Sequence, residues 1–151
     1  MTSDAAGIVD QFWSALYARD WDRIRSFFDA ESIYYDVPTG PTTAAKGPDG
    51  IIERLKLGIE GLDRYDHGGA SAVATGGDGL VMTEHTELWR WPTGESVELP
   101  FVSVHRVRGD VIALWRDYWD YTTLMNAAPP SWVEMLMSAD TPWLYDATGA
   151  V

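Results

Sequence analysis

The chain has 151 residues, a formal net charge of −12 and no cysteine, and 46% of its residues are hydrophobic. This length and composition suit one domain with a single core. The negative charge argues against binding to nucleic acid phosphates or anionic lipid surfaces, because both need clustered lysine and arginine side chains. The lack of cysteine excludes disulfides, thiolate catalysis and thiolate metal sites. No apolar run approaches the ~20 residues of a membrane-spanning helix and no signal-type segment is present, so we expect a cytoplasmic protein without membrane or nucleic-acid partners.

The first part of the chain predicts two helices and a strand. Residues 4–19 carry apolar side chains at helical spacing, and Asp4 can cap this helix. A second, short helix begins near Asp20 and buries a face rich in phenylalanine and isoleucine. The run SIYYDVP at residues 32–38 predicts a strand, which its proline ends.

The middle of the chain predicts a loop, a helix and a series of strands. The Gly-, Pro- and Thr-rich residues 39–50 suit a loop, and Asp49 opens a helix that continues over residues 50–62. The pattern then changes to alternating apolar and polar residues, separated by short turns rich in glycine. It predicts four long antiparallel strands, at residues 67–75, 80–91, 96–107 and 111–121.

This order of elements predicts an α+β domain over residues 1–128, in which the N-terminal helices pack on one face of a curved mixed or antiparallel sheet. A strongly curved sheet that helices close leaves a cone-shaped internal pocket, whose wall strands can direct polar groups inward. Residues 129–151 form a C-terminal extension with a short helix from Ser131 to about Met137. We expect this tail to wrap the body or a partner chain.

The segment LWRDYWDY at residues 114–121 places a carboxylate among aromatic rings. Side chains alternate faces along a strand, so Asp117 shares a face with Trp115 and Trp119. An unpaired buried carboxylate is costly, so this aspartate must be paired, be protonated or line a cavity that admits water. The alternative is a surface face on which Asp117 pairs with a neighbouring arginine.

A second polar pair lies on the strand LVMTEHTELWRW, where His85 and Glu87 share a face with Trp89. If this face and that of Asp117 both point inward, two carboxylates and an imidazole converge in one apolar cavity. Such a cavity raises the proton affinity of carboxylates, so one can act as an acid and the other as a base. Glu87 as a solvated strand residue and His85 as a structural histidine remain open alternatives.

The other candidate residues follow from the same pocket. Asp36 lies between Tyr35 and Val37 and could also merely cap the turn that follows. His85 and His105 could meet across strands, but no HxH or HExxH spacing occurs, so we expect no metal. No glycine-rich loop in a βα context is present, so no nucleotide cofactor is expected either. Aromatic side chains suit the walls of a small-molecule pocket, and the expected substrate-binding set is Trp89, Phe101, Trp115 and Trp119.

Three stretches carry a resemblance to a known family. They are TEHTELWRWPTGESVEL at residues 83–99, WRDYWDYTTL at residues 115–124 and IYYDVP at residues 33–38. Together they resemble limonene-1,2-epoxide hydrolase and its relatives, in the NTF2-like superfamily that also holds SnoaL-like and ketosteroid-isomerase-like proteins. The resemblance implies a homodimer that needs no cofactor and converts a small apolar epoxide to a diol in one step.

The family's catalytic positions can be carried over residue by residue. The resemblance implies that Asp117 is the base that activates water, that Glu87 is the acid that protonates the epoxide oxygen, and that His85 bridges the two carboxylates. Tyr34 and Asp36 fall on the tyrosine and asparagine that hold the water in the family. Only Asp117 and Tyr34 match the family's residue types, since the bridge is an arginine in the family and the acid an aspartate.

These departures keep two other functions open. An imidazole at residue 85 titrates near neutrality where the family has a permanent cation, and Asp36 adds a negative charge. His85 with Asp36 or Asp117 could therefore abstract a proton next to a carbonyl, as in ketosteroid isomerases, polyketide cyclases or dehydratases, while Tyr34 stabilises the enolate oxygen. A non-catalytic module that binds a small molecule would also suit this fold.

Overall fold

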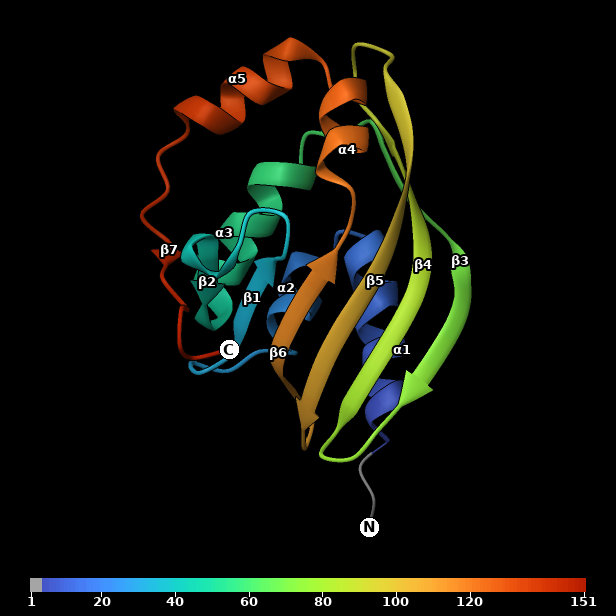
Figure 1. The fold of residues 1–151 in the computed structure, drawn as a ribbon, viewed down its shortest axis with the longest axis vertical. Helices are drawn as coiled ribbons and strands as arrows, with labels where there is room; N and C mark the ends of the chain where they lie inside the picture. The colour runs from blue at the N-terminus through green and yellow to red at the C-terminus, as the bar shows by residue number, and fades with distance from the viewer. Residues whose placement is uncertain (1–3) are drawn as a thin grey trace.

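Seven strands form one mixed sheet in the order β3-β4-β5-β6-β1-β2-β7 in the computed structural model, which describes residues 4–151 (Figure 1). The strands are β1 (Ile33–Asp36), β2 (Ala44–Lys46), β3 (Arg64–Thr75), β4 (Leu80–Arg90), β5 (Ser96–Arg108), β6 (Val111–Tyr118) and β7 (Leu144–Tyr145). The helices are α1 (Ala5–Tyr17), α2 (Trp21–Arg25), α3 (Gly47–Ile59), α4 (Tyr121–Ala127) and α5 (Pro130–Ser138), with a 3₁₀ turn η1 (Pro41–Thr43). The predicted α+β class, with N-terminal helices on a mixed, mostly antiparallel sheet, is confirmed.

The strand register brings together the acidic residues that the sequence singled out. Strands β3 to β6 are consecutive antiparallel neighbours, as predicted, and β1 joins them parallel to β6. In the parallel pair Asp36 lies opposite Asp117, and Tyr34 lies opposite Trp115. On the other side of β6, Ser103 of β5 pairs with Asp117. Directly paired residues share a face of the sheet, so these polar side chains lie next to one another.

The first helix packs against the face of the sheet on which these residues lie. Asp4 caps α1, because its side chain accepts a hydrogen bond from the Gly7 backbone N–H at 3.0 Å. Its apolar side chains Val9, Phe12 and Leu16 are fully buried in the main core. The helix ends at Tyr17, two residues before the predicted end. Arg19 adopts a positive φ of 50° and donates hydrogen bonds to carbonyl groups that follow α3.

The segment after β1 contains structure that its composition did not predict. Residues 39–50 were expected to be a loop, but they include η1 and β2, and β2 pairs antiparallel with β1. Strand β2 consists of two alanines and a lysine, and three such residues show no alternating pattern that predicts a strand. Helix α3 begins at Gly47 instead of Asp49, with proline in its first turn, where the missing N–H costs nothing.

The prediction of a strand through residue 121 is wrong at its end. Strand β6 ends at Tyr118, and the side chain of Asp120 accepts a hydrogen bond from the Thr122 backbone N–H at 3.0 Å, which starts α4. The aromatic pattern runs on through both elements, so it did not mark the boundary. Trp119 lies in the connection, and its indole donates a hydrogen bond to Asp36.

The C-terminal segment wraps the body of the chain, which was one of the two predicted arrangements. Strand β7 pairs with β2, and α5 lies above α3, near α4 (Figure 1), where Trp132 donates a hydrogen bond to the Gly58 carbonyl. Helix α5 begins at Pro130 and ends at Ser138, close to the predicted bounds. Over residues 4–151, no helix is long and apolar enough to cross a membrane.

Candidate active site

A cavity of about 370 Å³ opens between the sheet, α3 and the C-terminal segment. Its deep wall comes from β4, β5 and β6, and α3 supplies one side. Most of its surface is apolar and aromatic. Polar side chains reach it from β1, α3, β3, β4 and β6, namely Tyr34, Asp36, Arg54, Tyr65, Glu87 and Asp117.

Asp117 lies at the inner end of this cavity, almost fully buried at 4% exposure. Its Oδ1 accepts two hydrogen bonds of 2.6 Å, one from Ser103 Oγ and one from Trp115 Nε1. Burial raises the pKa of Asp117 well above its usual range, and the neighbouring Asp36 carboxylate raises it further. The two hydrogen bonds act in the opposite direction and do not cancel the rise. This carboxyl group therefore holds a proton more tightly than an aspartate in water.

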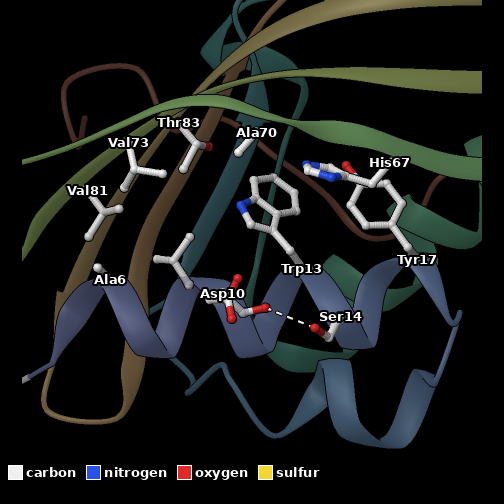
Figure 2. A pocket seen from close by; sticks show the side chains of 11 residues that line it. Ala6, Asp10, Trp13, Ser14, Tyr17, His67, Ala70, Val73, Val81 and Thr83 are labelled. Atoms are coloured by element: carbon white, nitrogen blue, oxygen red, sulfur yellow. Dashed lines mark hydrogen bonds between the residues drawn. The ribbon is translucent and has the colours of Figure 1, made fainter.

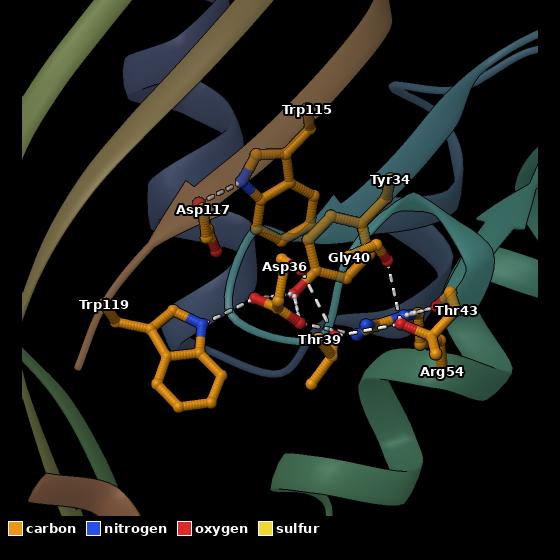
Figure 3. A network of polar contacts seen from close by, with 9 residues as sticks. All are labelled: Tyr34, Asp36, Thr39, Gly40, Thr43, Arg54, Trp115, Asp117 and Trp119. Carbon is orange, nitrogen blue, oxygen red and sulfur yellow. Dashed lines mark hydrogen bonds and ion pairs between the residues drawn. The ribbon is translucent and has the colours of Figure 1, made fainter. Parts of the chain in front are cut away.

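Asp36 is the centre of a polar network beside Asp117 (Figure 3). Its Oδ2 accepts a hydrogen bond from Arg54 Nη1 at 2.7 Å, and its Oδ1 accepts one from Trp119 Nε1 at 2.9 Å. The Tyr34 hydroxyl donates to the same carboxylate at 3.2 Å. Burial opposes the charge on Arg54, but Asp36, together with Tyr34 and Asp117, raises the pKa of the guanidinium above its usual value. Asp36 is thus held as an ion pair and is not merely a turn cap.

Glu87 is fixed by donors on both of its oxygens. Oε1 accepts hydrogen bonds from the hydroxyls of Tyr17 and Tyr65 at 2.8 and 3.0 Å, and Oε2 accepts one from Trp89 Nε1 at 2.7 Å. Burial, followed by the charge of Glu87, raises the pKa of Tyr17 and of Tyr65 well above the usual tyrosine value. Both phenols therefore stay protonated and keep donating. Glu87 is 3% exposed, so it is not a solvated strand residue.

His85 lies behind the cavity and does not belong to its wall. Its Nε2 is 3.7 Å from Glu87 Oε1, and neither ring nitrogen has a hydrogen-bond partner among the described residues. The ring packs between aromatic side chains, with centroid distances of 4.7 Å to Trp13 and 5.3 Å to Phe101. His85 thus lies next to Glu87, which is one of the two carboxylates that it was expected to bridge.

The four expected substrate-binding residues all line the cavity: Trp89, Phe101, Trp115 and Trp119. Trp115 is 1% exposed and stacks on Tyr34 with 3.9 Å between ring centroids. The C-terminal segment adds Trp132 and Trp143 to the wall. Aromatic side chains therefore surround the polar groups on several sides, which suits a largely apolar ligand.

Several residues of the site escaped the sequence analysis. Arg54 sits in an ordinary amphipathic helix pattern, where an arginine usually faces solvent. Tyr17 and Tyr65 lie far from Glu87 in sequence, and Ser103 is one of several small residues on its strand. Only the alternation of faces on the strand at residues 96–107 could have indicated Ser103, because it shares a face with Phe101.

A metal site has no support from the arrangement of ligands. Among residues 4–151, no group of three or more histidine, aspartate or glutamate side chains is close enough to hold an ion. His105, which could have met His85 across the strands, packs between Phe12, Trp13 and Trp115. Burial lowers the pKa of His105 to about 3, so its ring is neutral.

The fold and this cavity define a small-molecule enzyme or binder. The family model described as the SnoaL-like domain matches residues 9–115, and the chain belongs to that family. Solved structures of this NTF2-like fold from several organisms are similar to this chain at low sequence identity.

The first of these is a candidate SnoaL-like polyketide cyclase from Shewanella putrefaciens, 18% identical, with a TM-score of 0.73 over 84% of this chain and 97% of that one. An LEH-like epoxide hydrolase from M. tuberculosis is 20% identical, with a TM-score of 0.68 over 89% and 96% of the two chains. A hypothetical protein with a ketosteroid isomerase-like fold from Catenulispora acidiphila, in complex with trimethylamine, is 18% identical, with a TM-score of 0.70 over 83% and 93% of the two chains. At these identities the similarity establishes the fold and not the reaction.

Proposed function

We propose that the protein is an acid–base enzyme that moves a proton at a small, largely apolar molecule, with Asp117 as the group that takes the proton. One observation carries this proposal. Asp117 has one oxygen fixed by Ser103 and Trp115, while its other oxygen has no hydrogen-bond partner among the described residues, and the residue lines an aromatic cavity. A carboxylate with raised proton affinity in an apolar site is a stronger base than one in water.

The first reaction of this class is hydrolysis of an epoxide, which the resemblance to limonene-1,2-epoxide hydrolase favours. Asp117 takes a proton from water, the water oxygen bonds to one ring carbon, and the bond from that carbon to the ring oxygen breaks. The ring oxygen then takes a proton from Glu87, and the product is a diol. Glu87 would have to carry that proton beforehand, so the donors Tyr17, Tyr65 and Trp89 would have to reorient around it.

The second reaction is proton abstraction next to a carbonyl, as in isomerases and cyclases. The occupied oxygens of Glu87 favour it, because Asp117 is then the carboxylate with an oxygen free for the substrate. Asp117 takes a proton from carbon and returns it to another atom of the same substrate. Tyr34 and Arg54 line the same cavity, and Tyr34 can donate to the enolate oxygen that forms when its hydroxyl turns away from Asp36.

The test is product analysis of the purified chain with two panels of substrates. One panel contains small cyclic and aromatic epoxides in oxygen-18 water, and the other contains enones and β-hydroxyketones in deuterated water. Asp117→Asn is the variant that we expect to be inactive, and Asp110→Asn, which removes an exposed carboxylate just before strand β6, is the control. Each variant is checked for folding by circular dichroism.

The outcomes separate three functions. Labelled diol from the wild type and Asp110→Asn, but not from Asp117→Asn, would support epoxide hydrolysis. A rearranged or dehydrated ketone formed by the wild type and Asp110→Asn, but not by Asp117→Asn, would support the carbonyl reaction. Saturable binding of these compounds without turnover, in a folded wild type, would leave a binding module and contradict the enzymatic proposal.

We also propose that the chain forms a homodimer through the outer face of β4–β6. Met82 and Tyr118 are 39% and 43% exposed, and both line an apolar hollow on the strands there. Light scattering after size exclusion measures the mass. Met82→Glu should shift a dimer toward monomer, and a monomeric wild type would contradict this proposal.

A further inference from the structure

A second cavity of about 290 Å³ lies between α1 and the strands β3 and β4. Among the described residues, its wall has no member in common with the wall of the catalytic cavity. Figure 2 shows the Trp13 ring standing upright from α1, with Val73 and Thr83 on one side of it and His67 and Tyr17 on the other. The proposed function makes no use of this space.

The cavity exists because β3 sends small side chains toward α1. The strand reads HGGASAVAT over residues 67–75, and its register with β4 shifts on both sides of Ala70. Small residues at a bulged edge strand cannot fill the distance to a helix. The gap is left between Ala70 and Val73 on the strand and Val9 on the helix, all of which line the cavity.

Two polar groups in the wall are buried. Trp13 is 7% exposed, and Thr83 is 3% exposed. Neither Trp13 Nε1 nor Thr83 Oγ1 has a hydrogen-bond partner among the described residues. Buried polar groups without a hydrogen-bond partner are rare in native structures, so these two need a partner from outside the chain. An oxygen atom placed in this cavity can accept from the indole and exchange a hydrogen bond with the hydroxyl.

The other residues that line the second cavity indicate the chemistry of the rest of the ligand. Ala6, Val9, Val73 and Val81 are apolar, so they suit a hydrocarbon body. Asp10, an exposed residue of the same wall, disfavours an anion. We infer that this cavity is a second binding site for a small, uncharged hydrocarbon that carries a single hydroxyl or carbonyl oxygen.

Tyr17 connects this site to the catalytic cavity. Its ring lines the second cavity, while its hydroxyl donates to Glu87 in the first. Trp13 also contacts the ring of His85, which lies beside the same glutamate. An occupant of the second site therefore touches side chains that position Glu87.

The test is a titration of the nitrogen-15-labelled protein with cyclohexanol, read by NMR at the eight tryptophan indole N–H groups. Tryptophan-to-phenylalanine variants assign the signals. We expect a saturable shift of the Trp13 signal. Thr83→Val removes a hydroxyl without changing the shape of the side chain, so it should weaken binding about fivefold, the effect of one ordinary hydrogen bond. Cyclohexane should bind more weakly than the alcohol.

A matched pair of variants locates the ligand. Val73→Phe places a ring into the cavity, and Ala74→Phe places the same ring on the opposite face of the same strand. We expect the first to abolish the Trp13 shift and the second to keep it. A Trp13 shift that survives Val73→Phe, a shift confined to Trp115 and Trp119 of the catalytic cavity, or no shift at all would overturn the inference.

Discussion

Arg54 Nη1 and Asp36 Oδ2 lie 2.7 Å apart in an ion pair whose side chains are only 13% and 12% exposed. The pair joins α3 to β1 at the edge of the catalytic cavity. The guanidinium also lies over the Tyr34 ring, 4.7 Å from its centre, and donates to the Thr43 carbonyl at 3.1 Å. One arginine thus fixes the helix, the first strand and the turn that follows it.

Replacing this arginine should destabilise the fold. Arg54→Met keeps an apolar side chain of similar length but leaves Asp36 buried without its counter-charge. We expect a loss of about 3–5 kcal/mol in the free energy of unfolding, the usual cost of removing one partner from a buried ion pair. Urea denaturation of the variant and the wild type at neutral pH measures the difference.

A double mutant separates the charge effect from lost packing. Asp36→Asn with Arg54→Met removes both charges, so much of the loss should be recovered. A double mutant no more stable than Arg54→Met alone would mean that the arginine contributes through its contacts with Tyr34 and Thr43 instead.

Asp117 should make the wild type less stable relative to Asp117→Asn as the pH rises. Its pKa in the folded state is raised by burial above the ordinary aspartate value of 3.8, so the folded state binds its proton more tightly than the unfolded chain does. The carboxyl group therefore favours folding at low pH, and this advantage is lost as the pH rises from 3.8 through the folded pKa. The asparagine of Asp117→Asn does not ionise, so its contribution to stability does not change with pH.

The measurement is the free energy of unfolding of the wild type and Asp117→Asn at several pH values from 4 upward, with Asp110→Asn as the exposed control. We expect the buried variant to gain stability over the wild type with rising pH and the control to follow the wild type. A constant difference between the wild type and Asp117→Asn would contradict a raised pKa.

Much of the site could be predicted because strands have a strict period of two. That period places Asp117 with Trp115, and Glu87 with Trp89, and the structure joins each pair by an indole hydrogen bond. Periodicity within one strand does not report which helix covers it. Arg54 reaches the cavity because α3 packs beside β1, and that contact depends on tertiary packing.

Element boundaries were harder to predict for a local reason. Trp119 and Tyr121 continue the aromatic pattern of β6 although the strand has ended, and the capping Asp120 reads equally well as a polar strand residue. The short β2 forms because β1 and β7 offer it backbone partners on both sides. The three residues of β2 do not by themselves predict a strand.

Removing the hydroxyl of Ser103 should change the pH dependence of the reaction. Its hydrogen bond to Asp117 Oδ1 lowers the pKa of that carboxyl group, in opposition to burial. In Ser103→Ala the pKa of Asp117 should rise further, so activity that needs the ionised base should appear only at higher pH. The lost hydrogen bond should also cost about 1–3 kcal/mol of stability.

The profile of kcat/KM against pH, on whichever substrate the panels identify, measures this shift. Ser96→Ala on the same strand removes an exposed hydroxyl and serves as the control. An unshifted profile in Ser103→Ala, with lower rates at every pH, would mean that the serine only supports the fold.

His105 should make the fold sensitive to acid. Its pKa is lowered by burial from 6.5 to about 3 in the folded state, whereas the unfolded chain takes up its proton near 6.5. The unfolded state therefore binds more protons between these values, and this contribution to stability, complete above pH 6.5, is lost as the pH falls toward 3. A difference of one bound proton changes the free energy of unfolding by about 1.4 kcal/mol per pH unit.

The variant His105→Leu measures this contribution by urea denaturation at pH 7, 6, 5 and 4. As the pH falls, its free energy of unfolding should decrease less steeply than that of the wild type, by about 1.4 kcal/mol per pH unit. Parallel curves for the two proteins would mean that burial does not lower the pKa of His105 in the folded state.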